Sequence, residues 1–123
     1  MSQLDAQFIL AKEIFCNLGE ITTRKMFGGG GIYCNGLIFA ICDGDKFYIK
    51  CDDQNLSYFE AANMMPFYFE KSPGELVPMK YFEMPAEALQ DDEEACKWGR
   101  LGVEAQERSQ LNGSKVKPRK STK

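Results

Sequence analysis

Apolar residues near the start of the chain recur at the spacing of a helix. Between residues 4 and 19, five of them follow one another at steps of four, three, four and three: Leu4, Phe8, Ala11, Phe15 and Leu18. These steps place the five side chains on one face of a helix. Gly19 follows where a left-handed C-terminal cap commonly ends a helix. The pattern therefore predicts an amphipathic helix that ends near Gly19.

The pattern changes near residue 30, where strand-forming residues are grouped between turn signals. The segment 30–51 is rich in Ile, Tyr and Phe, which favour strands. Asn35-Gly36 and Asp43-Gly44 interrupt it, and both dipeptides are strong signals of tight hairpin turns. We therefore expect three antiparallel strands connected as a meander.

The turn lengths predict which side chains of the meander are buried. A two-residue turn at Asn35-Gly36 pairs Cys34 with Leu37. Because side chains alternate along a strand, five residues then share one face: Ile32, Cys34, Leu37, Phe39 and Ile41. A three-residue turn at 44–46 adds Phe47, Ile49 and Cys51 to this face, whereas an even-length turn adds Tyr48 and Lys50, so burial favours three residues. No two cysteines are directly opposed in this register, which argues against a cross-strand disulfide.

A second helix is expected in the segment 52–63. Asp52 or Asp53 is suited to its N-cap position. Three apolar residues form a short stripe: Leu56, Phe59 and Ala62. The stripe predicts a helix of about three turns.

Two further strands are expected between residues 66 and 85. Apolar and polar residues alternate in 66–71 and in 77–85, and Ser72-Pro73-Gly74 between them is typical of a turn. Pro78 has no N–H to donate to a neighbouring strand. The second of these strands is therefore expected at an edge of the sheet, at least at its start.

The last helix is expected in the segment 91–111. It opens with four acidic residues, which suit the positive end of a helix, and it closes near Arg108. Four residues lie along one side: Ala95, Trp98, Gly102 and Ala105. Gly99 and Gly102 are unusual, because each costs about 1 kcal/mol relative to alanine inside a helix. We expect them to allow close backbone approach to a neighbouring element or to a partner chain.

The order of elements is helix, three strands, helix, two strands and helix. It predicts an α+β fold of two layers, with helices on one face of an antiparallel sheet of about five strands. A chain of 123 residues, 44% of them hydrophobic, is long enough for one compact core. We expect one domain over residues 1–112 and a basic, disordered tail over residues 113–123.

Charge is distributed unevenly along the chain. The last nine residues contain five basic residues and no acid: Lys115, Lys117, Arg119, Lys120 and Lys123. Residues 1–114 then hold ten basic and eighteen acidic residues, a net charge of about −8, which repels a phosphate backbone. Nucleic acid is therefore expected to contact only the tail, which serves either as a weak tether or as a solubilising segment.

The sequence contains neither a membrane-spanning or signal segment nor a metal-binding motif. There is no run of about twenty apolar residues and no cleavable apolar segment at the start, which favours a cytoplasmic protein without membrane contact. There is no histidine, and the five cysteines are scattered without a Cys-x-x-Cys pair. No metal site is therefore expected, and the cysteines are expected to be buried, reduced thiols.

Four consecutive glycines at positions 28–31 raise the question of a phosphate-binding loop. A P-loop needs Gly-Lys-Ser/Thr after its glycines, and a dinucleotide fingerprint needs a helix that begins there. The chain instead continues into a predicted strand, so no nucleotide cofactor is expected. The glycines are expected to permit a bulge or a close backbone crossing. An anion nest formed by Arg24, Lys25 and glycine amides is a weaker hypothesis.

The residues argue against an enzyme. The chain has no histidine for general-base work near neutral pH, and no triad can be assembled in the usual way. Cys34, beside a hairpin turn, is a conceivable nucleophile, but no histidine is present to activate it. The acidic pairs Asp52-Asp53 and Asp91-Asp92 fall at predicted helix starts, where capping explains them. No catalytic residue is predicted.

Three stretches of the chain resemble the N-terminal domain of the TfoX family, also called Sxy, regulators of natural competence. They read RKMFGGGGIYCNGLIFAICDGDKFYIKCDDQN, MMPFYFE and MKYFEMPAEALQDDEEACKW. The most specific parts are Met26-Phe27-Gly28-Gly29, the strand Phe47-Tyr48-Ile49-Lys50, and residues 81–85 before the acidic helix start. The resemblance extends from the first helix through Ala105.

The resemblance implies an α+β domain similar to the secretion-chaperone-like folds, often paired as a homodimer, without known catalytic residues or cofactor. Full-length family members act in transcriptional activation of DNA-uptake genes alongside the cyclic-AMP receptor protein, and carry a separate helical C-terminal domain. This sequence lacks that domain, so a stand-alone form is expected. The motif marks six residues for interaction: Arg24, Met26, Phe27, Gly28, Gly29 and Tyr81.

Two hypotheses for function result. The first is a dimeric, non-enzymatic module that presents a sheet face or edge to a protein partner, within transcriptional regulation. Five aromatic residues are candidate contacts, although a core position is an alternative for each: Tyr33, Tyr48, Tyr68, Phe82 and Trp98. The second is a nucleic-acid-associated protein whose basic tail contacts phosphates while the body recruits another factor.

Overall fold

The computed structural model describes residues 2–26 and 29–116, with side chains up to Leu111. Within these ranges it contains three α-helices, one short 3-10 helix and six strands. In chain order they are α1 (Gln3–Ile14), β1 (Ile21–Met26), β2 (Gly29–Cys34), β3 (Leu37–Asp43), β4 (Lys46–Lys50), α2 (Leu56–Ala61), β5 (Pro66–Ser72), β6 (Glu75–Glu83), η1 (Ala86–Gln90) and α3 (Asp92–Val116).

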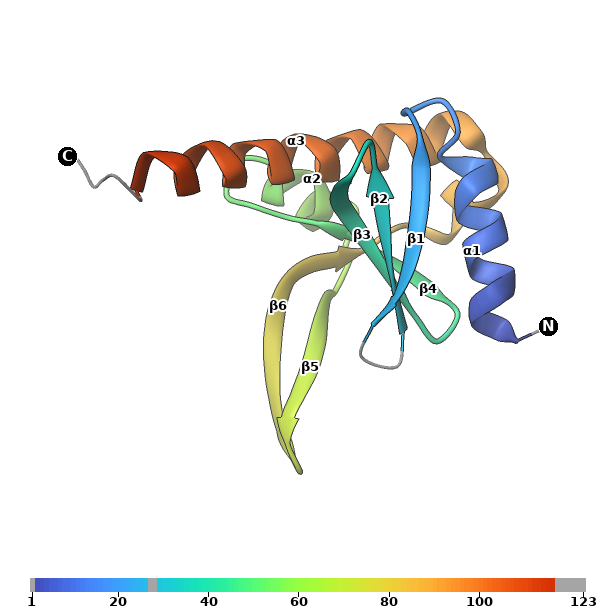
Figure 1. Cartoon of the computed structure of the whole chain (residues 1–123). Helices are drawn as coiled ribbons and strands as arrows, with labels where there is room; N and C mark the ends of the chain where they lie inside the picture. Colours follow the sequence, from blue (N-terminus) through green and yellow to red (C-terminus); the bar gives the residue numbers. More distant parts are fainter. Residues whose placement is uncertain (1, 27–28, 117–123) are drawn as a thin grey trace.

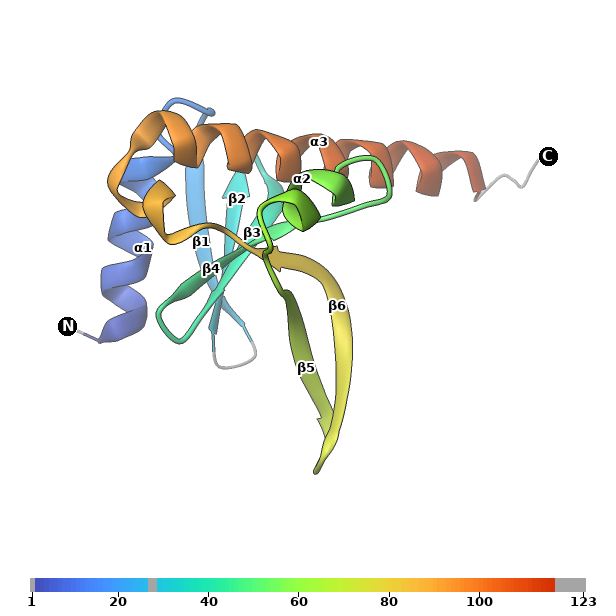
Figure 2. The same cartoon turned by 180° about the vertical axis from the view of Figure 1, so that it is seen from behind.

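The strands form one antiparallel sheet in the order β1-β2-β3-β4-β6-β5. α1 packs on β1 to β3, and α3 packs on β3 and β4. Figure 2 shows α3 running across one end of these strands and α1 beside β1, while the hairpin β5–β6 projects away from them (Figure 1). The predicted two-layer α+β class is confirmed. We call the side of the sheet without helices the open face.

The first helix is shorter than its apolar stripe predicted. Ser2 caps α1 in a capping box with Asp5. The helix ends at Ile14 with Phe15 as its C-cap, so the predicted end near Gly19 is wrong. Phe15 is fully buried and its ring meets that of Phe39 edge-to-face, with centroids 5.0 Å apart. Its packing in the core fixes the point where the chain leaves the helix.

One strand was not predicted. β1 pairs with β2 along its whole length, from Ile21 opposite Cys34 to Met26 opposite Gly29. Its middle residues, Thr22 to Lys25, are polar or charged, and three of these four side chains are exposed. A strand at the edge of a sheet has little apolar alternation to reveal it, so the sheet has six strands where about five were expected.

The first hairpin closes with the predicted pair, but a bulge alters the register beyond it. Cys34 pairs with Leu37 as predicted. Further from the turn, Tyr33 lies opposite Ile38 and Ile32 opposite Ala40, so Phe39 is an extra residue in β3. Ile41 consequently lies on the open face, which contradicts its predicted place beside Ile32.

The second turn compensates for the bulge. Asp43 pairs with Lys46, so the turn has two residues, 44 and 45, and the predicted three-residue turn is wrong. The predicted burial is nevertheless confirmed, because Phe47, Ile49 and Cys51 are all buried. The extra residue in β3 and the missing residue in the turn shift the alternation by one position each, and the two shifts cancel.

The second helix is shorter than predicted and begins later. α2 has six residues, and its N-cap is Asn55, not Asp52 or Asp53. Asn55 is 2% exposed, and its side-chain amide donates to the carbonyls of Lys50 and Leu101. These buried hydrogen bonds hold Asn55 in place. Asp52 instead accepts backbone N–H groups of Gln54 and Asn55.

The last two strands form a hairpin that projects from the sheet. The turn comprises residues 73 and 74, because Ser72 pairs with Glu75. β6 lies between β4 and β5, so it is not an edge strand over its full length. Only residues 81–83 pair with β4, however, and Pro78 pairs with β5 alone. The predicted edge character of its start is confirmed, and β5 is the outer edge. We call residues 65–80 the arm.

α3 lies close against the sheet at its two glycines. A Cβ atom at Gly102 would overlap the carbonyl oxygen of Phe39 and lie 2.9 Å from Cγ2 of Ile49. At Gly99 it would lie 2.7 Å from Cδ1 of Leu18. The predicted close approach is confirmed, toward elements of the same chain. Ala95, Gly102 and Ala105 are buried on this side, and Trp98 is half-buried.

α3 continues to Val116, past the end predicted near Arg108 and four residues into the segment predicted as a tail. Lys115 belongs to this helix. The other predicted tail residues, Lys117, Arg119, Lys120 and Lys123, lie outside the described residues. In Figure 1 the C-terminal part of α3 extends beyond the sheet.

Candidate functional site

A hollow lies on the open face, between β1–β3 and the arm. We call it the groove. Its volume is about 380 Å³, at the lower end of the range for small-molecule sites. Six side chains that line it are large and apolar or aromatic: Met26, Ile38, Ile41, Phe67, Phe69 and Met79. Asp43 and Tyr81 also line it, together with the backbone of Gly29 and Gly30.

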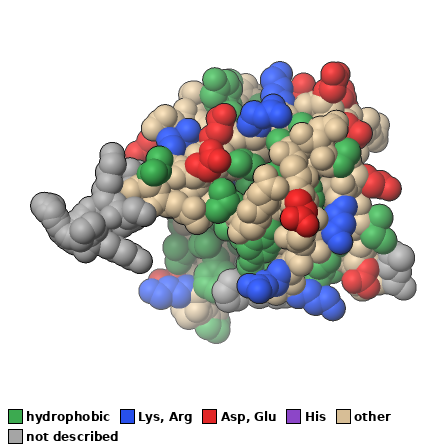
Figure 3. Space-filling view, turned by 45° about the horizontal axis from the view of Figure 1, so that its top comes forward, with side chains coloured by type: hydrophobic (Ala, Val, Ile, Leu, Met, Phe, Trp, Pro, Cys, Tyr) green, Lys and Arg blue, Asp and Glu red, His purple; other side chains and the backbone are tan. Residues whose placement is uncertain are grey.

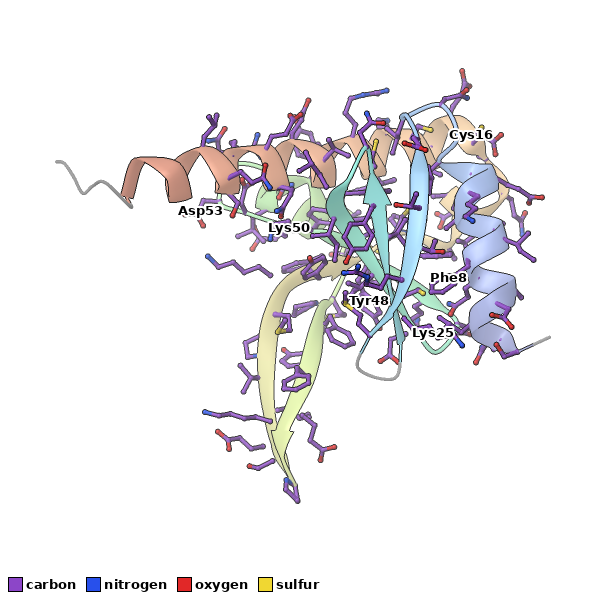
Figure 4. All side chains as sticks on the ribbon, in the orientation of Figure 1. Phe8, Cys16, Lys25, Tyr48, Lys50 and Asp53 are labelled. Atoms are coloured by element: carbon purple, nitrogen blue, oxygen red, sulfur yellow. The ribbon has the colours of Figure 1, made fainter. Side chains whose placement is uncertain are left out.

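The glycine run forms part of this groove. A Cβ atom at Gly29 would overlap the carbonyl oxygen of Cys42, and one at Gly31 would lie 2.8 Å from Cε of Met26 and 3.2 Å from Cδ1 of Ile38. On the other face, a Cβ atom at Gly30 would overlap the ring of Phe8, a residue labelled beside α1 in Figure 4. The predicted close backbone approach is found at Gly29, whereas Gly30 and Gly31 leave room for side chains.

The strand also accounts for the glycine amides. β2 pairs with β1 and with β3, and Gly30 and Gly31 each have a partner on both sides. In such a strand the N–H groups are used by the two ladders. An anion nest at Gly30 and Gly31 therefore has no free backbone amides to offer, and Gly28 lies outside the described residues.

The structure brings together several of the predicted interaction residues. Met26, Gly29 and Tyr81 line the same groove, although Tyr81 is more than fifty residues from the other two in the chain. Arg24 lies two residues from Met26 along β1 and shares its face; its side chain is exposed. Phe27 and Gly28 lie outside the described residues.

Tyr81 marks one end of the groove and is paired across β4 and β6 with Lys50, which itself lines a second hollow beside α3. The ammonium nitrogen of Lys50 lies 5.3 Å from the centre of the Tyr81 ring, within reach of a cation–π interaction. Burial lowers the pKa of Lys50, and Lys80 lowers it further, whereas Asp52 opposes the shift. Burial raises the pKa of Tyr81, and Tyr33 adds to it.

The other end carries acidic groups. Asp43 lines the groove opposite Lys46, and Lys46 donates to Glu83 Oε2 at 2.7 Å. Between the two ends, Tyr48 packs against Phe67 with ring centroids 4.9 Å apart. Burial raises the pKa of Tyr48. Figure 4 shows Tyr48 and Lys50 in the middle of the molecule, near the base of the arm.

The predicted contact aromatics divide into two groups. Tyr33 and Tyr48 are half-buried on the open face, and Tyr68 is 46% exposed on the arm. Phe82 and Trp98 instead pack against the fully buried Phe59 on the helix side, with ring centroids 5.5 and 5.1 Å from it. For these two residues the core interpretation is the right one.

Most exposed apolar residues of the arm were not predicted as contacts. Five large side chains of the arm are between 39% and 61% exposed: Met65, Tyr68, Phe69, Leu76 and Met79. Phe69 lies on the groove side opposite Val77, while Tyr68 and Leu76 lie on the reverse side. The signal that the alternating pattern hid was the occurrence of consecutive apolar or aromatic residues, at 67–69 and at 76–77.

A second, polar hollow of about 290 Å³ lies beside α3. Arg108 forms its main contact: Nε donates to Asp52 Oδ2 at 2.7 Å and Nη2 to Asp52 Oδ1 at 2.9 Å. This bidentate pair lowers the pKa of Asp52 and joins α3 to the segment before α2. Lys50 and Lys80 border the hollow, and Asp53 lies near it below α3 in Figure 4.

The cysteines of the structure are free thiols, of which only Cys16 is exposed. Burial raises the pKa of Cys34, and Glu107 adds to the shift; burial raises the pKa of Cys42 and Cys51 to about 11. These shifts disfavour the reactive thiolate. Within residues 2–26 and 29–116, no three Cys, Asp or Glu residues are grouped to hold a metal ion.

Figure 3 shows basic and acidic side chains interspersed on the visible surface. None of the helices among the described residues is both long and apolar enough to cross a membrane.

Comparison with known proteins agrees with this structure at the level of the domain. No curated protein sequence matches the chain. The family model described as TfoX N-terminal domain matches residues 13–106 of the 123. This match includes every strand, the groove and most of α3. The chain therefore belongs to the TfoX N-terminal domain family.

Proposed function

We propose that this chain is a non-enzymatic regulatory module that binds protein partners, including a second copy of itself, through the arm. The observation that supports it is the grouping of five exposed large apolar side chains on residues 65–80. Elsewhere among the described residues, the large apolar side chains of this exposure are Ile9, Tyr58 and Leu111, on three different helices. A local group of this kind marks an interaction surface.

The arm also has an edge strand whose backbone groups can pair with another strand. β5 is the last strand of the sheet and pairs only with β6, so its outer edge presents a row of N–H and C=O groups to another strand. In a symmetric dimer the same surface is used on both chains. Pairing of two arms along β5 would place Tyr68 of each chain beside the added strand, and Leu76 would lie on the same side of the extended sheet, one strand further in.

The biological setting is proposed from the family. Its regulators of natural competence suggest a cytoplasmic role in the control of DNA-uptake genes. The lack of histidine in the chain and the raised pKa values of the buried thiols favour a role through surface contacts over catalysis.

Light scattering at tens of micromolar protein tests the dimer. We expect the mass of a dimer for the unaltered chain and of a monomer for the double variant Tyr68→Ser, Leu76→Ser, because both side chains lie on the reverse side of the arm. The matched control is Ile9→Ser, Leu111→Ser, which removes two equally exposed apolar side chains from α1 and α3.

The control variant is expected to remain dimeric. A monomeric unaltered chain, or two variants that behave alike, would contradict the proposal. Circular dichroism of both variants verifies that the fold is retained.

The nucleic-acid hypothesis stays a prediction. Four of its five basic residues lie outside the described residues, and the fifth, Lys115, belongs to α3. One feature favours it as a second candidate: the end of α3 extends beyond the sheet (Figure 1), which places the start of the tail away from the acidic body.

A further inference from the structure

The polar hollow beside α3 gathers three cations, and we propose that it binds a dianionic phosphate group, either free or as the monoester of a small molecule. The cations are Lys50 at the end of β4, Lys80 on β6 and Arg108 on α3. Figure 4 shows Lys50 below α3. This inference goes beyond the proposed function, and it involves neither the edge of β5 nor the exposed apolar side chains of the arm.

The two lysines of the hollow have no anionic partner in the part of the chain that the structure describes. Neither ammonium forms an ion pair there, and the nitrogen of Lys50 lies instead over the Tyr81 ring. Burial lowers the pKa of Lys50, and the charge of Lys80 lowers it further, while Asp52 opposes the shift. Two like charges held near each other repel, and an anion placed between them removes that repulsion.

The carboxylate of Asp52 is already occupied and cannot serve as that anion. Its Oδ1 accepts the backbone N–H groups of Gln54 and Asn55. Nη2 and Nε of Arg108 donate to its Oδ1 and Oδ2. The other acid of the lining is Asp53, whose side chain is exposed at the rim. Because Arg108 neutralises Asp52, the hollow keeps two lysines against one exposed acid.

The donors around the hollow suit a phosphate better than a carboxylate. A phosphate monoester carries a charge of about −1.5 to −2 near pH 7 and three acceptor oxygens, so it can meet both ammonium groups, whereas a singly charged carboxylate leaves one lysine uncompensated. A guanidinium has five N–H donors, and Arg108 uses two of them on Asp52. Its remaining donors and the exposed hydroxyl of Ser109, which also lines the hollow, are available to further oxygens.

Titration calorimetry at constant ionic strength tests the proposal with inorganic phosphate, glycerol 3-phosphate, dimethyl phosphate and acetate. We expect the first two, which are dianions at about pH 8, to bind with dissociation constants on the order of 1 mM or below. Dimethyl phosphate and acetate have a single negative charge and should bind about tenfold more weakly. Amide NMR shifts should change at Cys51, Gln54 and Ser109. Tighter binding of glycerol 3-phosphate identifies a monoester as the ligand, and equal binding of the two dianions identifies the free ion.

Single charge changes test the residues of the site. Lys50→Met and Lys80→Met should each weaken phosphate binding about tenfold, because each removes one charge-assisted contact; methionine keeps an unbranched side chain to pack on Tyr81. The matched control is Lys97→Met, which removes an exposed lysine of α3 outside the hollow and should change phosphate affinity by less than about twofold. Asp53→Asn should strengthen phosphate binding about threefold, because it removes a repelling charge from the rim.

Three results would overturn the site: no binding of either dianion at about 10 mM, equal affinity for phosphate and acetate, or an effect of Lys97→Met as large as that of Lys50→Met. Retardation of a DNA duplex that is lost in Lys50→Met would also overturn it, since the hollow would then bind a nucleic-acid backbone. Light scattering of Lys50→Met separates this test from that of the proposed function. Loss of phosphate with the dimer retained supports the site alone, and a monomeric unaltered chain that binds phosphate contradicts only the dimer.

Discussion

The two faces of the sheet are built from the same strands, yet they differ in how completely they are packed. On the helix face, Phe39, Ala40 and Ile49 are 0% exposed and two glycines bring α3 against the strands. On the open face, Phe69 and Met79 are each 39% exposed beside an apolar groove. The helix face supplies the free energy of folding, and the open face leaves apolar surface available for binding.

The largest expected effect contrasts one phenylalanine from each face. Phe39→Ala should lower the free energy of unfolding by about 4 kcal/mol, because it empties a fully buried site. Phe69→Ala should lower it by about 1 kcal/mol or less, because its ring is partly in water already. Urea denaturation measures both. If Phe39→Ala does not fold, Phe39→Leu should still fold and lose about 1 kcal/mol; equal losses at both faces would contradict the comparison.

A smaller effect tests the contact between α3 and the sheet. Gly102→Ala should destabilise the protein by about 1.5 kcal/mol, because the clash with Phe39 and Ile49 exceeds the gain in helix propensity. Ser109→Ala, at an exposed position of the same helix, should be neutral or slightly stabilising. Thermal unfolding of the two variants measures the difference, and a stabilising Gly102→Ala would show that α3 is not held so closely.

The smallest expected effect concerns ion pairs, one beside α3 and one on the open face of the sheet. Asp52→Asn should cost about 1 kcal/mol at pH 7, because it weakens a bidentate, partly buried pair with Arg108. The pair lowers the pKa of Asp52 in the folded state, so its contribution is complete above the ordinary carboxyl pKa of about 3.9 and is lost as pH falls through the lower folded value.

The difference between the unaltered chain and Asp52→Asn should therefore narrow below about pH 3.9. Glu83→Gln is the control on the open face; it should have a smaller effect, because the Lys46 side chain of that pair is 50% exposed. Urea denaturation at pH 7 and at pH 3 compares the two variants. A constant difference for Asp52→Asn across this range would contradict the assigned cause.

The sequence was sufficient for the parts of the fold that depend on local chemistry. Asn35-Gly36 predicted the first hairpin and its closing pair, and the helix glycines predicted a close approach that Gly102 and Phe39 confirm. Elements set by distant contacts were placed less well. α1 ends early where Phe15 enters the core, and α2 begins at Leu56, directly after Asn55, whose side-chain amide donates to the carbonyl of Leu101.

The groove could not be predicted from the sequence, because it too depends on contacts between residues that are distant in the chain. Its walls come from β1, β3 and the arm, and which residues line it depends on a bulge at Phe39 that no local pattern announces. The sequence analysis assumed a regular hairpin without a bulge, and it therefore placed Ile41 on the buried face. The family motif did mark Met26, Gly29 and Tyr81, but only the fold shows that these residues line one groove.

The extra residue in β3 also fixes the length of the turn that follows it. If the bulge were lost without a change in chain length, Phe47, Ile49 and Cys51 would turn outward unless one residue were gained in the turn after Asp43. The bulge and the turn length are therefore coupled, and related domains with a three-residue turn here should pair β2 with β3 without the bulge.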